Sequence, residues 1–350
     1  MKKNKTIIIA EIGINHNGSM KNAYELIKKA KYCGADYVKF QYFKSDNLTQ
    51  KNCPLVGYQK KQSYKNQYDM LRKYEINITN LKKLKSFCRK IKLKFLISVF
   101  SFDDYIFASK YLNLKEIKIP SGEIENYELL NKLNIKKKKI FLSTGMSNLS
   151  IICNSLNVIS KKKVFNIKNN QIKIIDKNLH RRIKDKIILM HCVSNYPVLD
   201  KNSNILALND LSKFDLNLGY SDHTTNNVSA LASYMLGARV FEKHITLSNK
   251  MKGPDHLASM NYKDFKNYVH QIKLMNSILK LKNKKIRKNE KKISKLVKKS
   301  IVAKININKG EIFTYKNLTT KRPAFGISSS KYLMYLGKKA KKNYKSNEYI

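Results

Sequence analysis

Two histidines, His223 and His244, each stand at the end of a short apolar run that reads as a β-strand. Each is preceded two positions earlier by another polar residue, Ser221 in GYSDH and Glu242 in FEKH. Because side chains alternate along a strand, each of these polar pairs would share one face. If the two strands are neighbours in a parallel barrel, both imidazoles project at its C-terminal mouth and form a divalent-metal site open to substrate. The alternative is two unrelated polar residues at loop edges.

Polar side chains also end the other apolar runs of the chain, at Glu11, Lys39, Ser98, Lys118, Ser121, Glu123, Ser143 and Tyr196. A lysine inside a barrel is costly unless it meets an anion. Lys39 and Lys118, with the hydroxyls of Ser121, Ser143 and Ser221, would therefore form a pocket for phosphate and carboxylate. A lone strand lysine is more often a surface residue, but polar ends on seven strands are hard to explain by packing.

Strand-like and helix-like segments alternate from the start of the chain, which predicts a parallel α/β fold. Eight such units within residues 1–281 match a (β/α)8 TIM barrel in number and length. Residues 42–77 form a long, polar, Tyr-rich segment that is a candidate substrate loop. Residues 161–186 form a basic insertion without clear periodicity, for which we predict a surface location and assign no function.

The pattern changes after the barrel. Residues 282–299 are dense in Lys and read as a linker or an exposed helix. Residues 300–350 carry short β-type runs and a turn at Asn308-Lys309-Gly310, which predicts a small β-rich domain. A domain of about 50 residues is marginal alone, so we expect it to lean on the barrel or on a partner chain.

The 350 residues carry a formal net charge of +47, which suggests a nucleic-acid or membrane partner. Only seven of the 71 basic residues are Arg, however, and Arg is the residue that phosphate- and base-reading surfaces usually recruit. We therefore expect no specific nucleic acid. The five cysteines form no CxxC pair and indicate a reducing compartment. No apolar run approaches the length of a membrane span, so the sequence predicts a soluble, cytoplasmic protein.

In the barrel region, the motifs AEIGINHNGS, ADYVKFQ, KIPSGE, LSTGM, GYSDHT, FEKHITL and GPDHLASM resemble those of the sialic acid synthases, which include N-acetylneuraminate and N,N′-diacetyllegionaminate synthases. NKGEIFT and NLTTKRP resemble the antifreeze-like (SAF, β-clip) domain that follows the barrel in that family. The resemblance covers nearly the whole chain in the expected order. It implies condensation of phosphoenolpyruvate with an N-acylated hexose, giving a nine-carbon 2-keto acid and phosphate.

The resemblance also implies a role for each matching residue. A divalent ion, typically Mn²⁺, would lie on His223 and His244, with Glu242 beside it. Phosphoenolpyruvate contacts fall on Lys39, Ser98, Lys118, Ser121, Ser143 and Ser221. Sugar contacts fall on Glu11, Glu123, Tyr196 and Asp255, and Glu123 is expected to handle the water proton or the sugar hydroxyl. Arg322 would reach the active site of the other subunit in a domain-swapped homodimer.

Three substitutions depart from the family pattern. Ser98 replaces a common Thr and keeps the hydroxyl, so the phosphate contact is expected to persist. Val99 replaces a common Pro beside Ser98, and Ala324 replaces a Gly in the small domain, where Ala would be strained if a positive φ were needed. Two other functions remain open. The chain could use another sugar class, as a pseudaminate synthase does, or it could be a catalytically silent polyanion-binding protein.

Overall fold

The computed structural model describes residues 6–57, 64–169, 171–280 and 283–350. The chain divides into two compact units, residues 1–280 and residues 281–350, and each is considered by itself. Within the described ranges, no helix combines the length and apolar character needed to cross a membrane.

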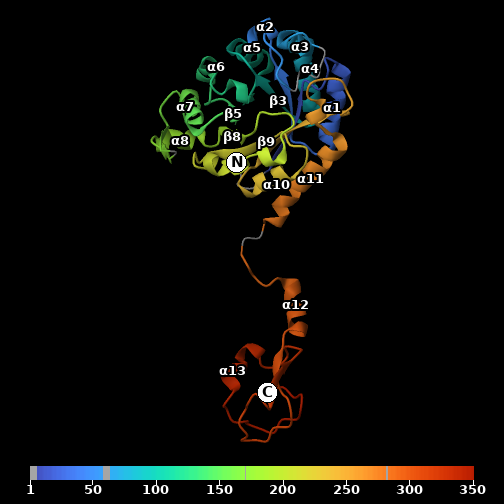
Figure 1. The fold of residues 1–350 in the computed structure, drawn as a ribbon, viewed down its shortest axis with the longest axis vertical. Helices are drawn as coiled ribbons and strands as arrows, with labels where there is room; N and C mark the ends of the chain where they lie inside the picture. Colours follow the sequence, from blue (N-terminus) through green and yellow to red (C-terminus); the bar gives the residue numbers. More distant parts are fainter. Residues whose placement is uncertain (1–5, 58–63, 170, 281–282) are drawn as a thin grey trace. The chain divides into compact units, whose positions relative to one another are not determined.

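Eight parallel strands form the centre of the first unit (Figure 1). The first and last of them pair, with Ile7 opposite Val240, so the sheet closes into a barrel. This closure confirms the predicted (β/α)8 fold class. In spatial order the strands are β1 (Ile7–Gly13), β2 (Tyr37–Tyr42), β3 (Lys94–Val99), β4 (Glu116–Ile119), β5 (Lys139–Ser143), β8 (Ile187–His191), β9 (Asn217–Asp222) and β10 (Val240–Thr246).

Amphipathic helices cover the outside of the strands (Figure 1). In α1 (Met20–Tyr32), for example, Ala23, Leu26, Ile27 and Ala30 are buried at helical spacing. The other covering helices are α4 (Ile78–Lys90), α5 (Phe102–Leu112), α6 (Tyr127–Lys132), α7 (Leu149–Ser160), α9 (Ala207–Ser212), α10 (Val228–Met235) and α11 (Tyr262–Ile278). The main apolar core lies between these helices and the strands.

A smaller apolar cluster fills the lower half of the barrel interior. It consists of Ile7, Ile9, Tyr37, Leu96, Phe141, Ile188, Met190 and Val240. Moving two residues along a strand keeps the side chain on the same face. The interior face therefore changes from Ile9 to Glu11, from Tyr37 to Lys39 and from Val240 to Glu242, so apolar layers support a polar upper layer.

Two stretches that the barrel pattern did not explain have defined structure. Residues 161–186 are more regular than predicted, since they contain an antiparallel hairpin of β6 (Phe165–Lys168) and β7 (Gln171–Ile174) followed by α8 (Lys177–Ile183). The segment 42–77 contains α2 (Ser45–Leu48) and α3 (Gln67–Tyr74), and its residues 58–63 lie outside the described part. Short elements of the barrel unit are η2 (Ser121–Glu123), η3 (Asp200–Asn202), η4 (His256–Ala258) and β11 (Met260–Asn261).

The second unit begins with α12 (Lys288–Val297), within the predicted linker. An antiparallel pair, β12 (Ser300–Ala303) with β13 (Leu318–Lys321), follows, together with η5 (Ser329–Lys331) and α13 (Tyr332–Tyr335). Its own core consists of Ile301, Ala303, Ile307, Phe313, Leu318, Ala340 and Tyr344. Ala324 is not among the residues with positive φ, so the departure from Gly causes no backbone strain there.

Candidate active site

Four buried ionic side chains lie on the upper interior layer of the barrel, and we call them the charged floor: Glu11, Lys39, Lys118 and Glu242. Lys118 Nζ lies 2.6 Å from Glu242 Oε1, and Lys39 Nζ lies 3.4 Å from the same oxygen. Lys39 Nζ is also 3.2 Å from Glu11 Oε1. Two cations thus face two carboxylates at the centre of the barrel, which makes their burial tolerable.

The charges of the floor depend on one another. Burial disfavours ionisation of Glu242, but Lys118 and Lys39 outweigh that effect and hold its pKa well below the usual range. Burial lowers the pKa of Lys118, and Lys39 adds to this, whereas the contact with Glu242 opposes it. Because Glu242 stays ionised at 2.6 Å from Lys118, we assign the pair its charged form. Burial raises the pKa of Glu11, partly offset by Lys39.

Four serine hydroxyls surround the floor. Lys39 Nζ donates to Ser98 Oγ at 3.0 Å, and Ser221 Oγ donates to Glu242 Oε1 at 2.8 Å. Ser121 Oγ accepts from the backbone N–H of Gly145 at 3.0 Å. The fourth hydroxyl, Ser143, is buried at the end of β5. Hydroxyls and ammonium groups at this spacing suit the oxygens of a phosphate or a carboxylate.

The two imidazoles lie above the floor on neighbouring strands. Strands β9 and β10 pair in parallel with Ser221 opposite Glu242, and the rings of His223 and His244 are 5.8 Å apart between centroids. Burial lowers the pKa of His223 to about 4 and takes that of His244 well below its ordinary value. Both rings are therefore neutral at pH 7, the form in which an imidazole can bind a metal.

The hydrogen bonds of these rings are compatible with metal ligation. His223 Nδ1–H donates to the carbonyl of Val193 at 2.7 Å. The proton therefore lies on Nδ1, and the lone pair of Nε2 is available to a metal ion. His244 Nδ1 and Glu242 Oε2 are buried without a hydrogen-bond partner. Among the described residues, no three His, Cys, Asp or Glu side chains form a complete ligand group. A divalent ion would therefore have two imidazoles from the chain and take its other ligands from water and substrate.

A cavity of about 600 Å³ joins these groups at the C-terminal mouth of the barrel. Of the predicted site residues, it is lined by Glu11, Lys39, Ser98, Lys118, Ser121, Ser143, Tyr196, Ser221, His223, Glu242, His244 and Asp255. Glu123, the last residue of η2, is not among the lining residues, and its Oε2 accepts from Asn126 Nδ2 at 2.7 Å. Arg322 lies in the second unit.

The loop that carries Asp255 is fixed by contacts that the sequence did not reveal. His256 Nε2–H donates to Asn17 Oδ1 at 3.0 Å, and Asn17 Nδ2 donates to the carbonyl of Lys252 at 2.9 Å. Gly253 has φ +152°, and a Cβ there would come within 2.6 Å of the His256 ring. The loops after β1 and β10 therefore hold each other in place. Burial raises the pKa of Asp255 to about 7, with a smaller contribution from Glu11.

A second buried ion pair lies on the outer face of the same two strands. Lys243 Nζ is 3.1 Å from Asp222 Oδ2, and both side chains are almost fully buried. Asp222 Oδ1 accepts from the backbone N–H and the hydroxyl of Thr224. Because Asp222 and Lys243 adjoin His223 and His244 in sequence, this pair fixes the strand ends that carry the imidazoles.

The fold and the site define a class: a parallel α/β barrel whose active-site candidate, a charged floor under two neutral imidazoles, lies at the C-terminal mouth. Comparison with known proteins is more specific. Residues 26–284 match the NeuB family. The N,N′-diacetyllegionaminic acid synthase of Campylobacter jejuni is 42% identical over 349 residues, 99% of each chain. The chain belongs to the NeuB family.

Two further similarities agree with this assignment. The N,N′-diacetyllegionaminic acid synthase of Legionella pneumophila is 34% identical over 339 residues, covering 96% of this chain and 90% of that one. The structure of N-acetylneuraminic acid synthetase from Leptospira borgpetersenii in complex with citrate has a TM-score of 0.67 at 24% identity. It covers 83% of this chain and 90% of its own, and it supports the fold.

Proposed function

We propose that the chain condenses phosphoenolpyruvate with an N-acylated hexose to give a nine-carbon 2-keto acid and phosphate. The observation that carries this proposal is the charged floor beneath two neutral imidazoles, inside a cavity large enough for both substrates. The relatives named as N,N′-diacetyllegionaminic acid synthases favour legionaminic acid as the product. Pseudaminic acid synthases are more distant relatives of the chain.

The floor can hold phosphoenolpyruvate through its two lysines. Lys39 and Lys118 already share the single oxygen Glu242 Oε1. An incoming phosphate or carboxylate would compete for these ammonium groups, with the hydroxyls of Ser98, Ser121 and Ser143 as further donors. The carboxylates Glu11 and Glu242 keep both lysines charged when no substrate is bound, so the site is prepared for an anion in advance.

His223 and His244 are the residues that would hold a divalent ion, and Mn²⁺ is our proposal. When bound, such an ion supplies Lewis-acid polarisation of the sugar aldehyde. C3 of phosphoenolpyruvate forms a bond to the aldehyde carbon as the C2–C3 double bond and the carbonyl π bond open. C2 takes up water, and phosphate leaves with cleavage of the C2–O bond to give the ketone. One proton of the water ends on the former aldehyde oxygen and the other on the phosphate. Asp255, with a pKa of about 7, is partly protonated at neutral pH and can donate a hydrogen bond to a sugar hydroxyl.

A product assay tests the proposal. Purified protein is incubated with phosphoenolpyruvate, Mn²⁺ and a panel of aldoses, and products are identified by mass spectrometry while phosphate release is measured. The panel contains N-acetylmannosamine and the 2,4-diacetamido-2,4,6-trideoxy hexoses with the configurations required for legionaminic and pseudaminic acid. A nine-carbon keto acid with stoichiometric phosphate is expected. Absence of sugar-dependent phosphate release from the whole panel would refute the function.

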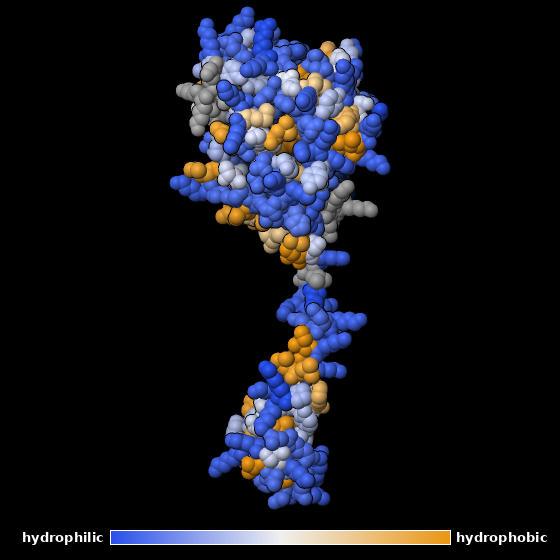
Figure 2. Space-filling view, turned by 90° about the vertical axis from the view of Figure 1, so that its right-hand side faces the viewer, coloured by the Kyte–Doolittle hydropathy of each residue, from blue (hydrophilic) through white to orange (hydrophobic). Residues whose placement is uncertain are grey.

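We further infer that the second unit, residues 281–350, is an antifreeze-like domain that completes the active site of a partner copy. It exposes large apolar side chains, including Phe325 and Leu333, which are 66% and 71% exposed. Figure 2 shows apolar side chains gathered on α12 and the adjoining part of this unit. Among the residues described, its core cluster contains only seven buried apolar side chains. Such a surface favours docking against another chain.

Subunit mixing tests the assembly. His223→Ala and Arg322→Ala each inactivate a different part of the proposed composite site. If Arg322 acts on the partner barrel, mixed dimers contain one intact site and the mixture regains part of the wild-type activity. If the subunits exchange, as shown by mass-tagged copies, and activity does not return, the second unit acts on its own barrel.

A further inference from the structure

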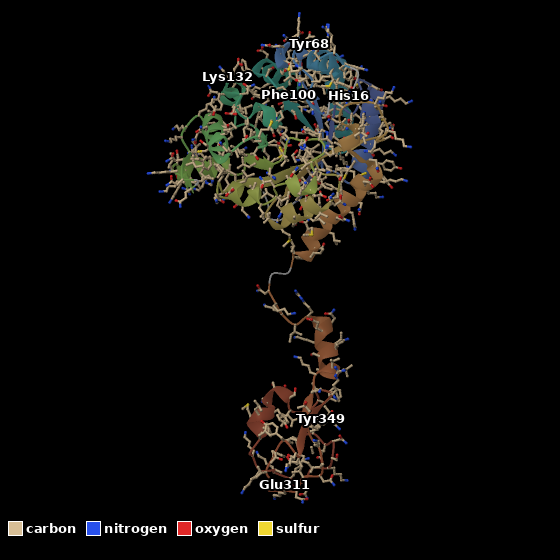
Figure 3. All side chains as sticks on the ribbon, in the orientation of Figure 1. His16, Tyr68, Phe100, Lys132, Glu311 and Tyr349 are labelled. Carbon is tan, nitrogen blue, oxygen red and sulfur yellow. The ribbon has the colours of Figure 1, made fainter. Side chains whose placement is uncertain are left out.

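Three neighbouring strand ends meet at one edge of the cavity. Ser121 follows β4, Gly145 follows β5 and Cys192 follows β8, and these strands are adjacent in the barrel. Ser121 and Cys192 both line the cavity. Phe100, which is labelled in Figure 3, follows β3 on the other side of β4 and lines the same cavity. Neither the proposed metal site nor the proposed phosphoenolpyruvate contacts give Cys192 a role.

The loop after β5 brings its backbone close to both of these side chains. The backbone N–H and the hydroxyl of Thr144 donate to the carbonyl of Met190 in β8, at 3.0 and 3.2 Å. A Cβ on Gly145 would lie 2.8 Å from Ser121 Oγ and 2.8 Å from Cys192 Sγ, so the close approach requires glycine. The backbone N–H of Gly145 can therefore reach Ser121 Oγ, to which it donates at 3.0 Å.

The hydroxyl of Ser121 has a second contact, with the thiol of Cys192. Ser121 Oγ and Cys192 Sγ are 3.0 Å apart, and either atom can be the donor. A hydroxyl has one proton and two lone pairs, and the N–H of Gly145 occupies one of these lone pairs. If the thiol donates to the other lone pair, the Ser121 proton is left to point into the cavity. If Ser121 instead donates to the sulfur, a lone pair of the hydroxyl faces the cavity.

Two other hydroxyls at the floor have proton directions that charged neighbours set. Ser98 accepts from the ammonium group of Lys39, so its own proton can be donated to a substrate. Ser221 donates its proton to the carboxylate of Glu242. Ser121 contacts a backbone N–H and a thiol, so the direction of its proton depends on which way the thiol bond runs.

We propose that the thiol of Cys192 donates to Ser121 when phosphoenolpyruvate is bound, and thereby turns the Ser121 proton toward an anionic oxygen of the substrate. The inference rests on the proposed condensation and makes Cys192 a positioning residue that acts through Ser121. An S–H group is a weak donor. An anion in the cavity nevertheless favours this arrangement, because the opposite one would place an oxygen lone pair against negative charge.

A double-mutant cycle tests whether the thiol acts through the hydroxyl. Ser121→Ala removes the hydrogen bond to the anion and should raise the dissociation constant of phosphoenolpyruvate by about 10- to 100-fold. Cys192→Ala keeps the hydroxyl and removes the donor that directs it, so the expected rise is about 5-fold. In the Ser121→Ala background Cys192→Ala should add little, whereas two independent effects would multiply. Cys192→Ser keeps a donor and should bring the dissociation constant within about 2-fold of wild type.

Cys33→Ala is the matched control. Cys33 and Cys192 are each 5% exposed, and the Cys33 thiol donates to the carbonyl of Tyr262 at 3.1 Å, but Cys33 is not among the residues that line the cavity. Loss of its S–H bond should leave phosphoenolpyruvate binding unchanged.

Binding of phosphoenolpyruvate to the full-length proteins is measured by calorimetry with Mn²⁺ and without sugar, and KM for the sugar should be the same in wild type and the Cys192 variants. Thermal melting establishes that each variant folds, and Cys192→Val is a second variant without a donor. An unchanged dissociation constant in a folded Ala or Val variant, a Ser variant as weak as the Ala variant, or effects that multiply in the double variant would overturn the inference. A wild-type protein that binds no phosphoenolpyruvate and forms no product would instead overturn the proposed condensation.

Discussion

Asp255→Asn should stabilise the protein at alkaline pH. The carboxyl of Asp255 lies in the cavity wall with 8% of the residue exposed, and burial raises its pKa from the ordinary 3.8 to about 7. The unfolded chain loses this proton near pH 4, whereas the folded chain keeps it until about pH 7. An acid with a raised folded pKa therefore costs stability progressively as the pH rises between these values, and the cost is constant above them.

The size of this stability cost follows from the pKa shift of Asp255. One pKa unit corresponds to about 1.4 kcal/mol, so the charged side chain costs the folded state about 4 kcal/mol at pH 8. At pH 5 the same calculation gives about 2 kcal/mol, because the unfolded carboxyl is almost fully ionised, the folded one is still protonated, and the cost has grown only over the interval from pH 3.8 to pH 5. Asn has a similar shape and no charge, so the substitution removes this cost and leaves the backbone contacts of the loop in place.

Unfolding of the wild-type protein and the Asn variant is measured at pH 5 and pH 8 without substrate or metal. The variant's advantage should grow by roughly 2–3 kcal/mol between the two pH values. Its kcat/KM for the sugar should lose the pH dependence that ionisation of Asp255 causes near pH 7, since the Asn amide can donate a hydrogen bond at every pH. An advantage that is equal at both pH values would show that the charge is not the cause. A less stable variant at pH 8 would show that the ionised carboxylate is well satisfied.

Further predictions concern the other charged groups. Chelation should abolish condensation and Mn²⁺ restore it, and His223→Ala or His244→Ala should weaken Mn²⁺ binding in calorimetry; full activity in metal-free buffer would refute the metal site. Lys39→Ala and Lys118→Ala should each weaken phosphoenolpyruvate binding by about 1.5–3 kcal/mol, with the sugar affected less; unchanged KM for phosphoenolpyruvate in both would show that it binds elsewhere. Asp222→Asn removes the carboxylate that neutralises the buried ammonium of Lys243, which keeps only the Thr224 carbonyl as an acceptor, and should lower the free energy of unfolding by about 3–5 kcal/mol; a denaturation midpoint equal to wild type would contradict this pairing.

The barrel and the floor of the site were predictable because both follow from local patterns. The alternation of strands and helices gave the fold class, and period-two alternation put Glu242 and His244 on one strand face. The end of each apolar run marked where a strand meets the mouth. Once the fold class was assigned, residues such as Lys39 and Ser98 could therefore be predicted to lie close together.

The features of the site that the sequence did not predict depend on the register of the strands and on contacts between segments far apart in the chain. The sequence predicted Lys39 and Lys118 as anion-binding groups but not their sharing of Glu242 Oε1, because that contact depends on the stagger of nonadjacent strands. The role of Glu123 was expected from the resemblance and not from geometry; in the structure its Oε2 accepts from Asn126 Nδ2, a contact that the sequence did not predict.

The closure of the barrel by β1 and β10 has a consequence for how the protein is made. Glu11 lies opposite His244, roughly 230 residues later in the chain. At about 5–20 residues per second, a ribosome needs roughly 10–50 seconds between these two positions. During that interval β1 has one unpaired edge, and such edges favour association with other chains. The active site is therefore among the last features to form during synthesis, and a nascent chain that stops before β10 is prone to aggregate.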